Sequence, residues 1–226
     1  WTATRKKSIL DSRTQSTQLL YRAIVQAEQK PLAFISASAI GYYGFQTGAT
    51  LVEENSPAGK DFLADVVVAW EQEVKKIEAL SLRCVLLRIG IVLDAKGGAL
   101  GEMLKPPFAA PLGSGDQWMS WIHIEDLASM FVFALEKTTL QGVFNAVGPN
   151  PSTNQQLTKE AAMAKGKPYV GIGVPGFALK LVLGEMAAMV LGGNRVSCKK
   201  IEKAGFEFQK NPTTFTKRKF MIKWLV

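Results

Sequence analysis

Segments with the periodicity of amphipathic helices alternate along this chain with short runs typical of buried strands. Residues 2–28 and 61–80 carry apolar side chains at helical spacing, whereas residues 32–38 and 81–93 form short, nearly continuous apolar runs. We expect a further helix at 126–137, with Asp126 as its N-cap, and a third strand at 142–147. Because parallel strands are joined by crossovers that are usually helical, this alternation predicts an α/β fold with a parallel sheet.

The pattern changes after residue 167, where Pro and Gly interrupt the chain before an apolar helix and a basic tail. We therefore expect a main domain over 1–167 and a small C-terminal lobe over 168–226. The stretch GIGVPG at 171–176 has the spacing of a dinucleotide-binding loop. However, only 50 residues follow it, and Pro175 lacks the N–H group that such a loop would present to a phosphate. A structural turn is the favoured interpretation.

The formal net charge of +8 comes from scattered Lys and Arg residues that are not interleaved with aromatic side chains. We therefore expect no nucleic-acid partner, whereas an anionic ligand would suit the basic surface. No apolar run approaches the roughly 18–20 residues that a membrane-spanning helix needs, so no membrane association is expected. The two cysteines indicate neither a disulfide framework nor a metal site, and a reducing cytoplasm is the expected location.

The stretch ISASAIGYYG at 35–44 is an apolar run that ends in Ser38, Gly41 and the adjacent Tyr42 and Tyr43. Ligands of α/β proteins bind at the carboxyl ends of the strands, so this strand end is a candidate site. A Ser hydroxyl there can polarise a reacting oxygen, and a phenol can exchange a proton. The alternatives are that Ser38 caps the strand end and that one tyrosine is an amphipathic packing residue whose hydroxyl is satisfied at the surface. The lone His123 is either a base or an anchor of the turn before the next helix.

The segment GSGDQWMSWIHIEDLA at 113–128 resembles a motif of the extended short-chain dehydrogenases/reductases. Around it, ISASAIGYYG, AWEQEV and LLRIGIVLDAKGGALGEML follow in the order of an atypical branch of the NAD-dependent epimerase/dehydratase group, sugar-nucleotide-epimerase-like or cell-division-inhibitor-like. The resemblance runs from Trp1 to about Phe208. It implies a Rossmann-like, doubly wound parallel sheet whose first strands, with the Gly-rich pyrophosphate loop, would precede Trp1.

The family's catalytic Tyr-x-x-x-Lys pair is absent. None of the four tyrosines has a lysine four residues later, and alignment on AWEQEV places the pair at Leu63 and Val67. The family's Ser falls at Ser38, with Tyr42 and Tyr43 just beyond it. Two interpretations stay open: one of these tyrosines has taken over the acid/base role, or the protein binds a dinucleotide without redox chemistry.

The resemblance implies NADP as the cofactor, with NAD as the alternative, and a small-molecule substrate such as a sugar nucleotide or another alcohol or ketone. The alternative function is a non-catalytic regulator or scaffold linked to cell division, and a homodimer and a protein partner are left open. The candidate site residues follow: catalytic, Ser38, Tyr42 and Tyr43; cofactor-binding, Ser36, Ala37, Arg88, Gly90 and Ile91; substrate-side, Gly41, Met103 and His123.

Overall fold

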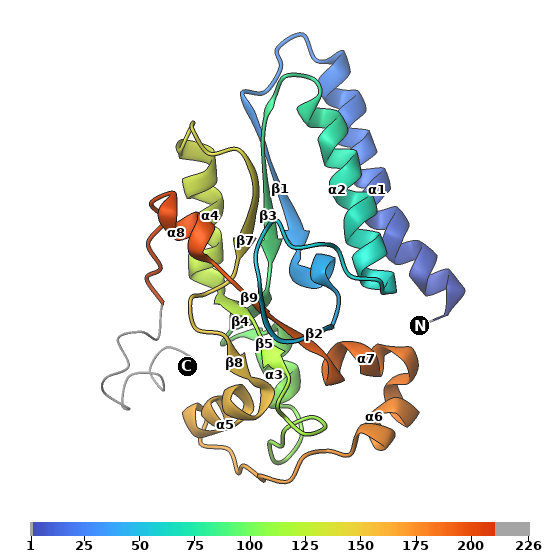
Figure 1. Ribbon diagram of the computed structural model, residues 1–226, viewed down its shortest axis with the longest axis vertical. Helices are drawn as coiled ribbons and strands as arrows, with labels where there is room; N and C mark the ends of the chain where they lie inside the picture. The colour runs from blue at the N-terminus through green and yellow to red at the C-terminus, as the bar shows by residue number, and fades with distance from the viewer. Residues whose placement is uncertain (1, 211–226) are drawn as a thin grey trace.

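The computed structural model, which describes residues 2–210, is built around a three-stranded parallel sheet with helices on both faces (Figure 1). The strand order is β1 (Ala33–Ala39), β3 (Arg83–Ile89) and β7 (Gly142–Ala146). Helices α1 (Ala3–Gln26) and α2 (Phe62–Glu78) cover one face, and α4 (Ile124–Glu136) and α8 (Lys199–Lys203) cover the other. The predicted doubly wound α/β arrangement is therefore confirmed.

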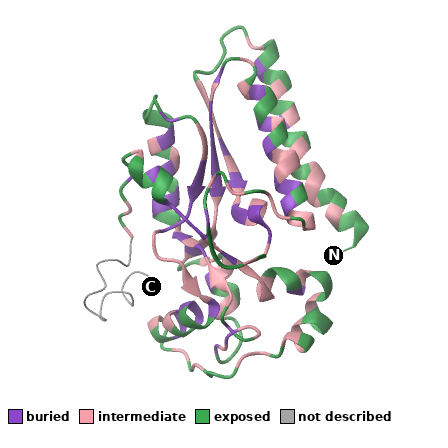
Figure 2. Ribbon diagram, in the orientation of Figure 1, coloured by how far each residue is buried: buried purple, intermediate pink, exposed green. Residues whose placement is uncertain are grey.

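The two long helices form where the helical spacing predicts them. The side chains of Thr2 and Asp61 accept backbone N–H bonds and so cap the N-termini of α1 and α2. The apolar stripe of α2 faces inwards, so that Val74 and Ile77 are fully buried. Figure 2 shows the buried residues concentrated on the central strands and on the inner sides of these helices. Burial of these apolar stripes holds the helices to the sheet.

The expected strand at 81–93 is in fact two strands, because the chain changes partners at Gly90. Strand β3 ends at Ile89, and β4 (Ile91–Asp94) pairs instead with β6 (Trp121–His123). A Cβ atom on Gly90 would lie 2.5 Å from the carbonyl oxygen of Ser120 and 2.7 Å from Val147 Cγ1. Only glycine allows this close approach, so the prediction of a single strand was wrong at this residue.

The predicted N-cap of α4 was also wrong. His123 occupies the N-cap position, and its Nδ1 accepts the N–H of Glu125 at 3.2 Å. Asp126 lies inside the helix and is buried, and its carboxylate accepts N–H bonds at 2.9 Å from Gln209 and at 3.0 Å from Lys210. This aspartate therefore fastens the end of the described chain to α4 rather than starting the helix.

The remaining elements form short two-stranded sheets and a group of helices below the central sheet. They are η1 (Ile40–Tyr43), β2 (Gln46–Val52), α3 (Gly98–Met103), β5 (Trp118–Met119), β8 (Ser152–Thr153), α5 (Asn154–Ala164), α6 (Gly176–Leu183), η2 (Gly184–Met186), α7 (Ala187–Leu191) and β9 (Gly193–Val196). Strand β9 runs parallel to β2, which directly follows the η1 turn. This pairing brings the C-terminal region back to the end of β1 (Figure 1).

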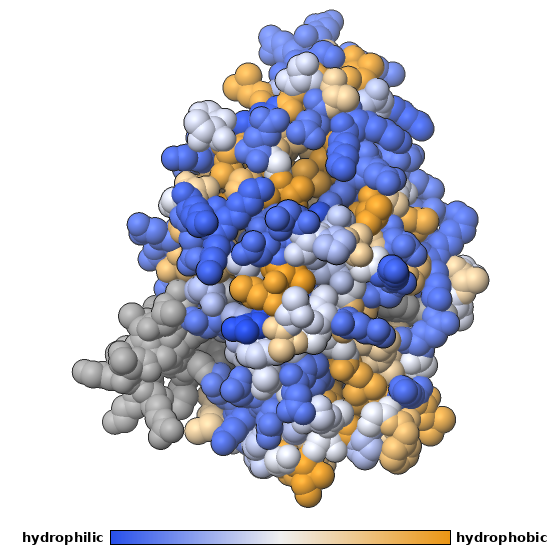
Figure 3. Space-filling view, in the orientation of Figure 1, coloured by the Kyte–Doolittle hydropathy of each residue, from blue (hydrophilic) through white to orange (hydrophobic). Residues whose placement is uncertain are grey.

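The region after residue 168 divides between the main core and the surface. Val196, Ile201 and Phe206 belong to the same apolar cluster as the central sheet. By contrast, α6 exposes Phe177, Leu181 and Val182, and orange side chains gather in this part of Figure 3. The boundary at 168 stays a prediction, and the predicted basic tail lies outside the described residues. Within residues 2–210 no helix is both long enough and apolar enough to cross a membrane.

Candidate functional site

The register of the central sheet aligns polar residues near the carboxyl ends of its strands. Ser38 on β1 is paired with Arg88 on β3, and Arg88 is paired with Asn145 on β7. All three side chains are buried. The η1 turn follows β1 directly and carries Tyr42 and Tyr43 to the same place. Four of the predicted residues, Ser38, Tyr42, Tyr43 and Arg88, are thus brought together.

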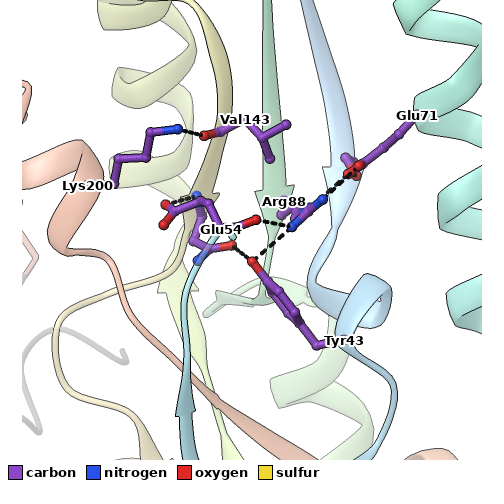
Figure 4. A network of polar contacts seen from close by, with 8 residues as sticks. Tyr43, Glu54, Glu71, Arg88, Val143 and Lys200 are labelled. Atoms are coloured by element: carbon purple, nitrogen blue, oxygen red, sulfur yellow. Dashed lines mark hydrogen bonds and ion pairs between the residues drawn. The ribbon is translucent and has the colours of Figure 1, made fainter. Parts of the chain in front are cut away.

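An ion pair between Arg88 and Glu71 of α2 forms the centre of this cluster (Figure 4). Arg88 Nε donates to Glu71 Oε1 and Nη2 to Oε2, both at 2.8 Å, which makes the pair bidentate. Their side chains are only 4% and 7% exposed. Burial disfavours the charge on Arg88, but its bonds to Glu71 outweigh burial and raise the pKa of the guanidinium. Ser38 Oγ donates to Glu71 Oε1 at 2.6 Å, which gives the carboxylate a further donor.

Tyr43 extends the network from Arg88 to β7. Its hydroxyl donates to Asn145 Oδ1 at 2.7 Å and accepts from Arg88 Nη1 at 3.1 Å. Glu54 closes the far side, because its carboxylate accepts the N–H of Asn145 at 2.9 Å and its carbonyl accepts from Arg88 Nη1 at 3.2 Å. Burial raises the pKa of the Tyr43 phenol, although the nearby Arg88 acts in the opposite direction. Tyr43 is therefore a buried, neutral bridge between two strands.

Tyr42 differs from Tyr43 because its hydroxyl makes no hydrogen bond within the described part of the chain. The guanidinium carbon of Arg88 lies 3.4 Å from the centroid of the Tyr42 ring, and the two tyrosine rings meet edge to face at 5.4 Å. Such contacts fix the orientation of the ring. The side chain is only partly buried. Tyr42 thus combines a fixed ring with a phenol hydroxyl that is free of protein partners in this region.

The turn that carries Tyr42 packs directly on the two positions where the family's catalytic pair would stand. A Cβ atom on Gly41 would lie 3.8 Å from Val67 Cγ2 and 3.9 Å from Leu63 Cβ. Both side chains belong to the inner side of α2, and Val67 is 4% exposed. Gly41 therefore packs against apolar side chains of α2, and its substrate-side role stays a prediction.

Most groups predicted to contact the cofactor are bonded inside the protein. The N–H of Gly90 donates to the carbonyl of Ala146 at 3.1 Å, and that of Ile91 donates to Ser120 at 2.9 Å. Ser36 is buried, with its hydroxyl donating to the carbonyl of Ala37 at 2.9 Å. Together with the closed ion pair of Arg88, these bonds leave few donors for a ligand. The cofactor role of Ser36, Ala37, Arg88, Gly90 and Ile91 stays a prediction.

The two other substrate-side candidates lie outside the cluster. Met103 packs against a second apolar group around Leu93 and Leu100, and His123 is held as the N-cap of α4. A separate hollow of about 530 Å³ lies near Met103, beside α3 and the loop after α5, and none of the predicted site residues line it. Within residues 2–210, no group of His, Cys, Asp and Glu side chains is arranged to hold a metal ion.

Sequence reasoning missed Glu71, Glu54 and Asn145 as members of the network. A signal was present for Glu71, which stands among the buried Val67 and Val74 on the apolar side of α2. Arg88 likewise interrupts an apolar strand. Two opposite charges in apolar surroundings predict an ion pair, because buried charges are nearly always paired. Nothing in the local sequence points to Asn145.

Comparison with known proteins places this fold among relatives. The chain is 37% identical over 229 residues to the epimerase family protein YfhF of Bacillus subtilis. This alignment covers 100% of the chain and 73% of YfhF. The sequence profile of the NAD dependent epimerase/dehydratase family matches residues 101–148. The chain belongs to this family. A domain of unknown function, DUF1731, matches residues 174–211.

Two solved structures of epimerase-type proteins are similar as well. The human epimerase family protein SDR39U1, crystallised with NADPH, is 33% identical, with a TM-score of 0.84 over 92% of this chain and 72% of that one. The nucleoside-diphosphate sugar epimerase of Corynebacterium glutamicum is 29% identical, with a TM-score of 0.75 over 92% of this chain and 41% of that one. The resemblance to the epimerase/dehydratase group is thus confirmed, whereas these comparisons do not support the cell-division-inhibitor-like branch.

Proposed function

We propose that the protein binds NADPH and acts as an epimerase-like oxidoreductase on an alcohol or ketone carbon of a sugar nucleotide or a related carbonyl compound. Family membership supports the nicotinamide cofactor, and the human relative crystallised with NADPH supports the phosphorylated form over NAD. The Corynebacterium structure, a nucleoside-diphosphate sugar epimerase, supports the substrate class. The observation that carries the proposal is the Tyr42 phenol, held on the Arg88–Glu71 pair at the strand ends.

The described residues fit the nicotinamide end of such a cofactor better than its phosphates. The carboxyl ends of parallel strands are where α/β folds bind ligands, and a phenol free of protein hydrogen bonds stands there. The N–H groups of Gly90 and Ile91 are already bonded, so they supply no phosphate cradle. We infer that the turn from Ala39 to Tyr42 would contact the nicotinamide end. When bound, NADPH would supply the hydride.

Tyr42 would hold and donate the proton at the reacting oxygen. The Arg88 guanidinium packs against the ring of Tyr42 and fixes its orientation. Glu71 holds Arg88 in place through two bonds, and Ser38 holds Glu71 through a third. Ser38 would therefore act as a positioning residue rather than by polarising the substrate, and Tyr43 would hold the turn.

A second candidate function is dinucleotide binding without catalysis. It is favoured by the apolar Leu63 and Val67 at the family's catalytic positions, and by the largely closed network around Arg88. None of the similar proteins described above supports a link to cell division.

The test compares two neighbouring phenols in the full-length protein. NADPH binding is measured by calorimetry. Turnover is measured as NADPH consumption with carbonyl compounds, and as NADPH formation from NADP⁺ or appearance of an epimeric product with nucleotide sugars. Tyr42→Phe should reduce kcat by about 10²–10⁴-fold and leave NADPH affinity unchanged, because it removes one proton donor. The matched control Tyr43→Phe should cost about 1–3 kcal/mol of stability, because Asn145 Oδ1 loses its buried donor and Arg88 Nη1 loses one of its two acceptors.

Three results decide between the proposals. If Tyr42→Phe turns over as fast as the unchanged protein, Tyr42 is not the proton donor. If NADPH binds but no compound of the panel is converted, the non-catalytic candidate replaces the oxidoreductase. If NADPH does not bind at all, both proposals fail.

A further inference from the structure

Arg195 on β9 is a cation without a hydrogen-bond or ion-pair partner in the region that the structure describes. Its Nε atom is buried and has no hydrogen-bond partner, and no carboxylate of residues 2–210 lies within ion-pair distance of it. Its contact is instead aromatic: the guanidinium carbon lies 4.7 Å from the centroid of the Trp118 ring. Buried donors in folded proteins nearly always have a partner, so this atom calls for an explanation.

Arg195 belongs to the strand that also holds the turn of the proposed active site. The preceding residue, Asn194, donates from Nδ2 to the carbonyls of Ile40 at 3.2 Å and Gly44 at 2.8 Å. These two carbonyls bracket the η1 turn that carries Tyr42. Successive side chains of a strand point to opposite faces, so Arg195 lies on the face of β9 opposite to Asn194 and the turn.

The outer side of this guanidinium can be reached from solvent. In the parallel pair of β2 and β9, Val52 and Val196 are partners and both are buried, whereas Leu51 and Arg195 are partners on the opposite face. Leu51 is 41% exposed, and Arg195 is partly exposed although its Nε is not. A bound group can therefore approach the fork of the guanidinium from this face.

We propose that Arg195, held against Trp118, is an anion-binding subsite for the phosphate or carboxylate part of the substrate. This inference rests on the proposed function, because it assigns the substrate's charged portion to the strand that holds the turn of Tyr42. A guanidinium offers parallel N–H donors that match the oxygens of phosphate or carboxylate, and the flat indole ring keeps the guanidinium oriented. The formal net charge of +8 also favours an anionic ligand.

Calorimetric titration with inorganic pyrophosphate tests the subsite in the full-length protein saturated with NADPH. Saturation removes binding at the cofactor's own phosphate positions, so the remaining heat reports a different place. Arg195→Gln should weaken pyrophosphate binding by about tenfold to a hundredfold, because one charge-assisted contact is lost. The matched control is Arg22→Gln on the outer side of α1, which should leave binding unchanged.

Further measurements keep the test decisive. Thermal unfolding of each variant checks that it folds; if Arg195→Gln does not, Arg195→Lys replaces it and should still bind severalfold more weakly, because lysine lacks the planar fork. A parallel titration with malonate identifies carboxylate as the preferred group if it, rather than pyrophosphate, depends on Arg195. Equal binding of both anions by the Arg195 variant and the unchanged protein would overturn the subsite, as would an equal loss in Arg22→Gln. Failure of the unchanged protein to bind NADPH would instead refute the proposed function.

Discussion

Breaking the ion pair between Glu71 and Arg88 should destabilise the protein far more than removing it altogether. Arg88→Met leaves the Glu71 carboxylate buried with Ser38 as its remaining side-chain donor, and Glu71→Leu leaves a buried guanidinium without its counter-charge. Loss of one partner from a buried pair costs about 3–5 kcal/mol, because the other charge stays desolvated.

The double variant should cost less than either single change. Replacing both residues by apolar side chains removes both buried charges at once, and such exchanges are often close to neutral. The bonds lost to the Glu54 carbonyl, the Tyr43 hydroxyl and the Ser38 hydroxyl remain as a penalty of about 1–3 kcal/mol. Since the two single changes would sum to about 6–10 kcal/mol, the two residues should show a large coupling energy.

Urea denaturation of the four proteins measures this coupling as a double-mutant cycle. The control is Glu73→Leu on the same helix, where Glu73 pairs with the exposed Lys76 at 2.8 Å; its cost should stay below about 1 kcal/mol. If the double variant loses the sum of the two single changes within about 0.5 kcal/mol, the pair is not coupled and the reasoning fails.

Three further predictions follow from the same contacts. Gly90→Ala should cost about 1–3 kcal/mol in urea denaturation, because its Cβ would overlap the neighbouring strand, whereas Gly101→Ala on α3, with open space around it, should be neutral or slightly stabilising. Burial raises the pKa of the Cys198 thiol in the folded protein to about 12. In the unfolded chain the same thiol has the ordinary cysteine pKa of about 8.5. Because unfolding then releases a proton, the free energy of unfolding should fall as the pH rises from about 8.5 towards 12, and less steeply in Cys198→Ala. Asp126→Ala should speed hydrogen exchange at the amides of Gln209 and Lys210, which donate to this carboxylate; unchanged exchange would show that other contacts hold this segment.

The periodicity of the sequence predicted the α/β class and most elements, because helix and strand spacing reflect which side chains are buried. It could not divide the run at 81–93, where the apolar pattern continues smoothly through Gly90. The break comes from the Ser120 carbonyl and the Val147 side chain, which are distant in sequence. Asp126 misled for a similar reason: its residue type suits an N-cap, but its partners are the backbone amides of residues 209 and 210.

The candidate site was found through the strand end at 35–44, since neighbouring parallel strands end at one edge of the sheet. In the structure Ser38, Tyr42 and Tyr43 lie together with Arg88, while their roles stay predictions. The strand-end rule did not reveal which hydroxyls would be occupied by protein partners. That distinction depends on Glu71 and Asn145, which come from another helix and another strand.

The structure of the full-length protein with NADPH bound tests the central claim most directly. The account predicts a nicotinamide ring at the carboxyl ends of β1 and β3, beside the η1 turn. A substrate carbon would then fit about 3–3.5 Å from the ring, with its oxygen about 2.6–3.2 Å from the Tyr42 hydroxyl. A nicotinamide bound away from this strand edge, or a Tyr42 hydroxyl turned away from it and bonded to another protein group, would contradict the account.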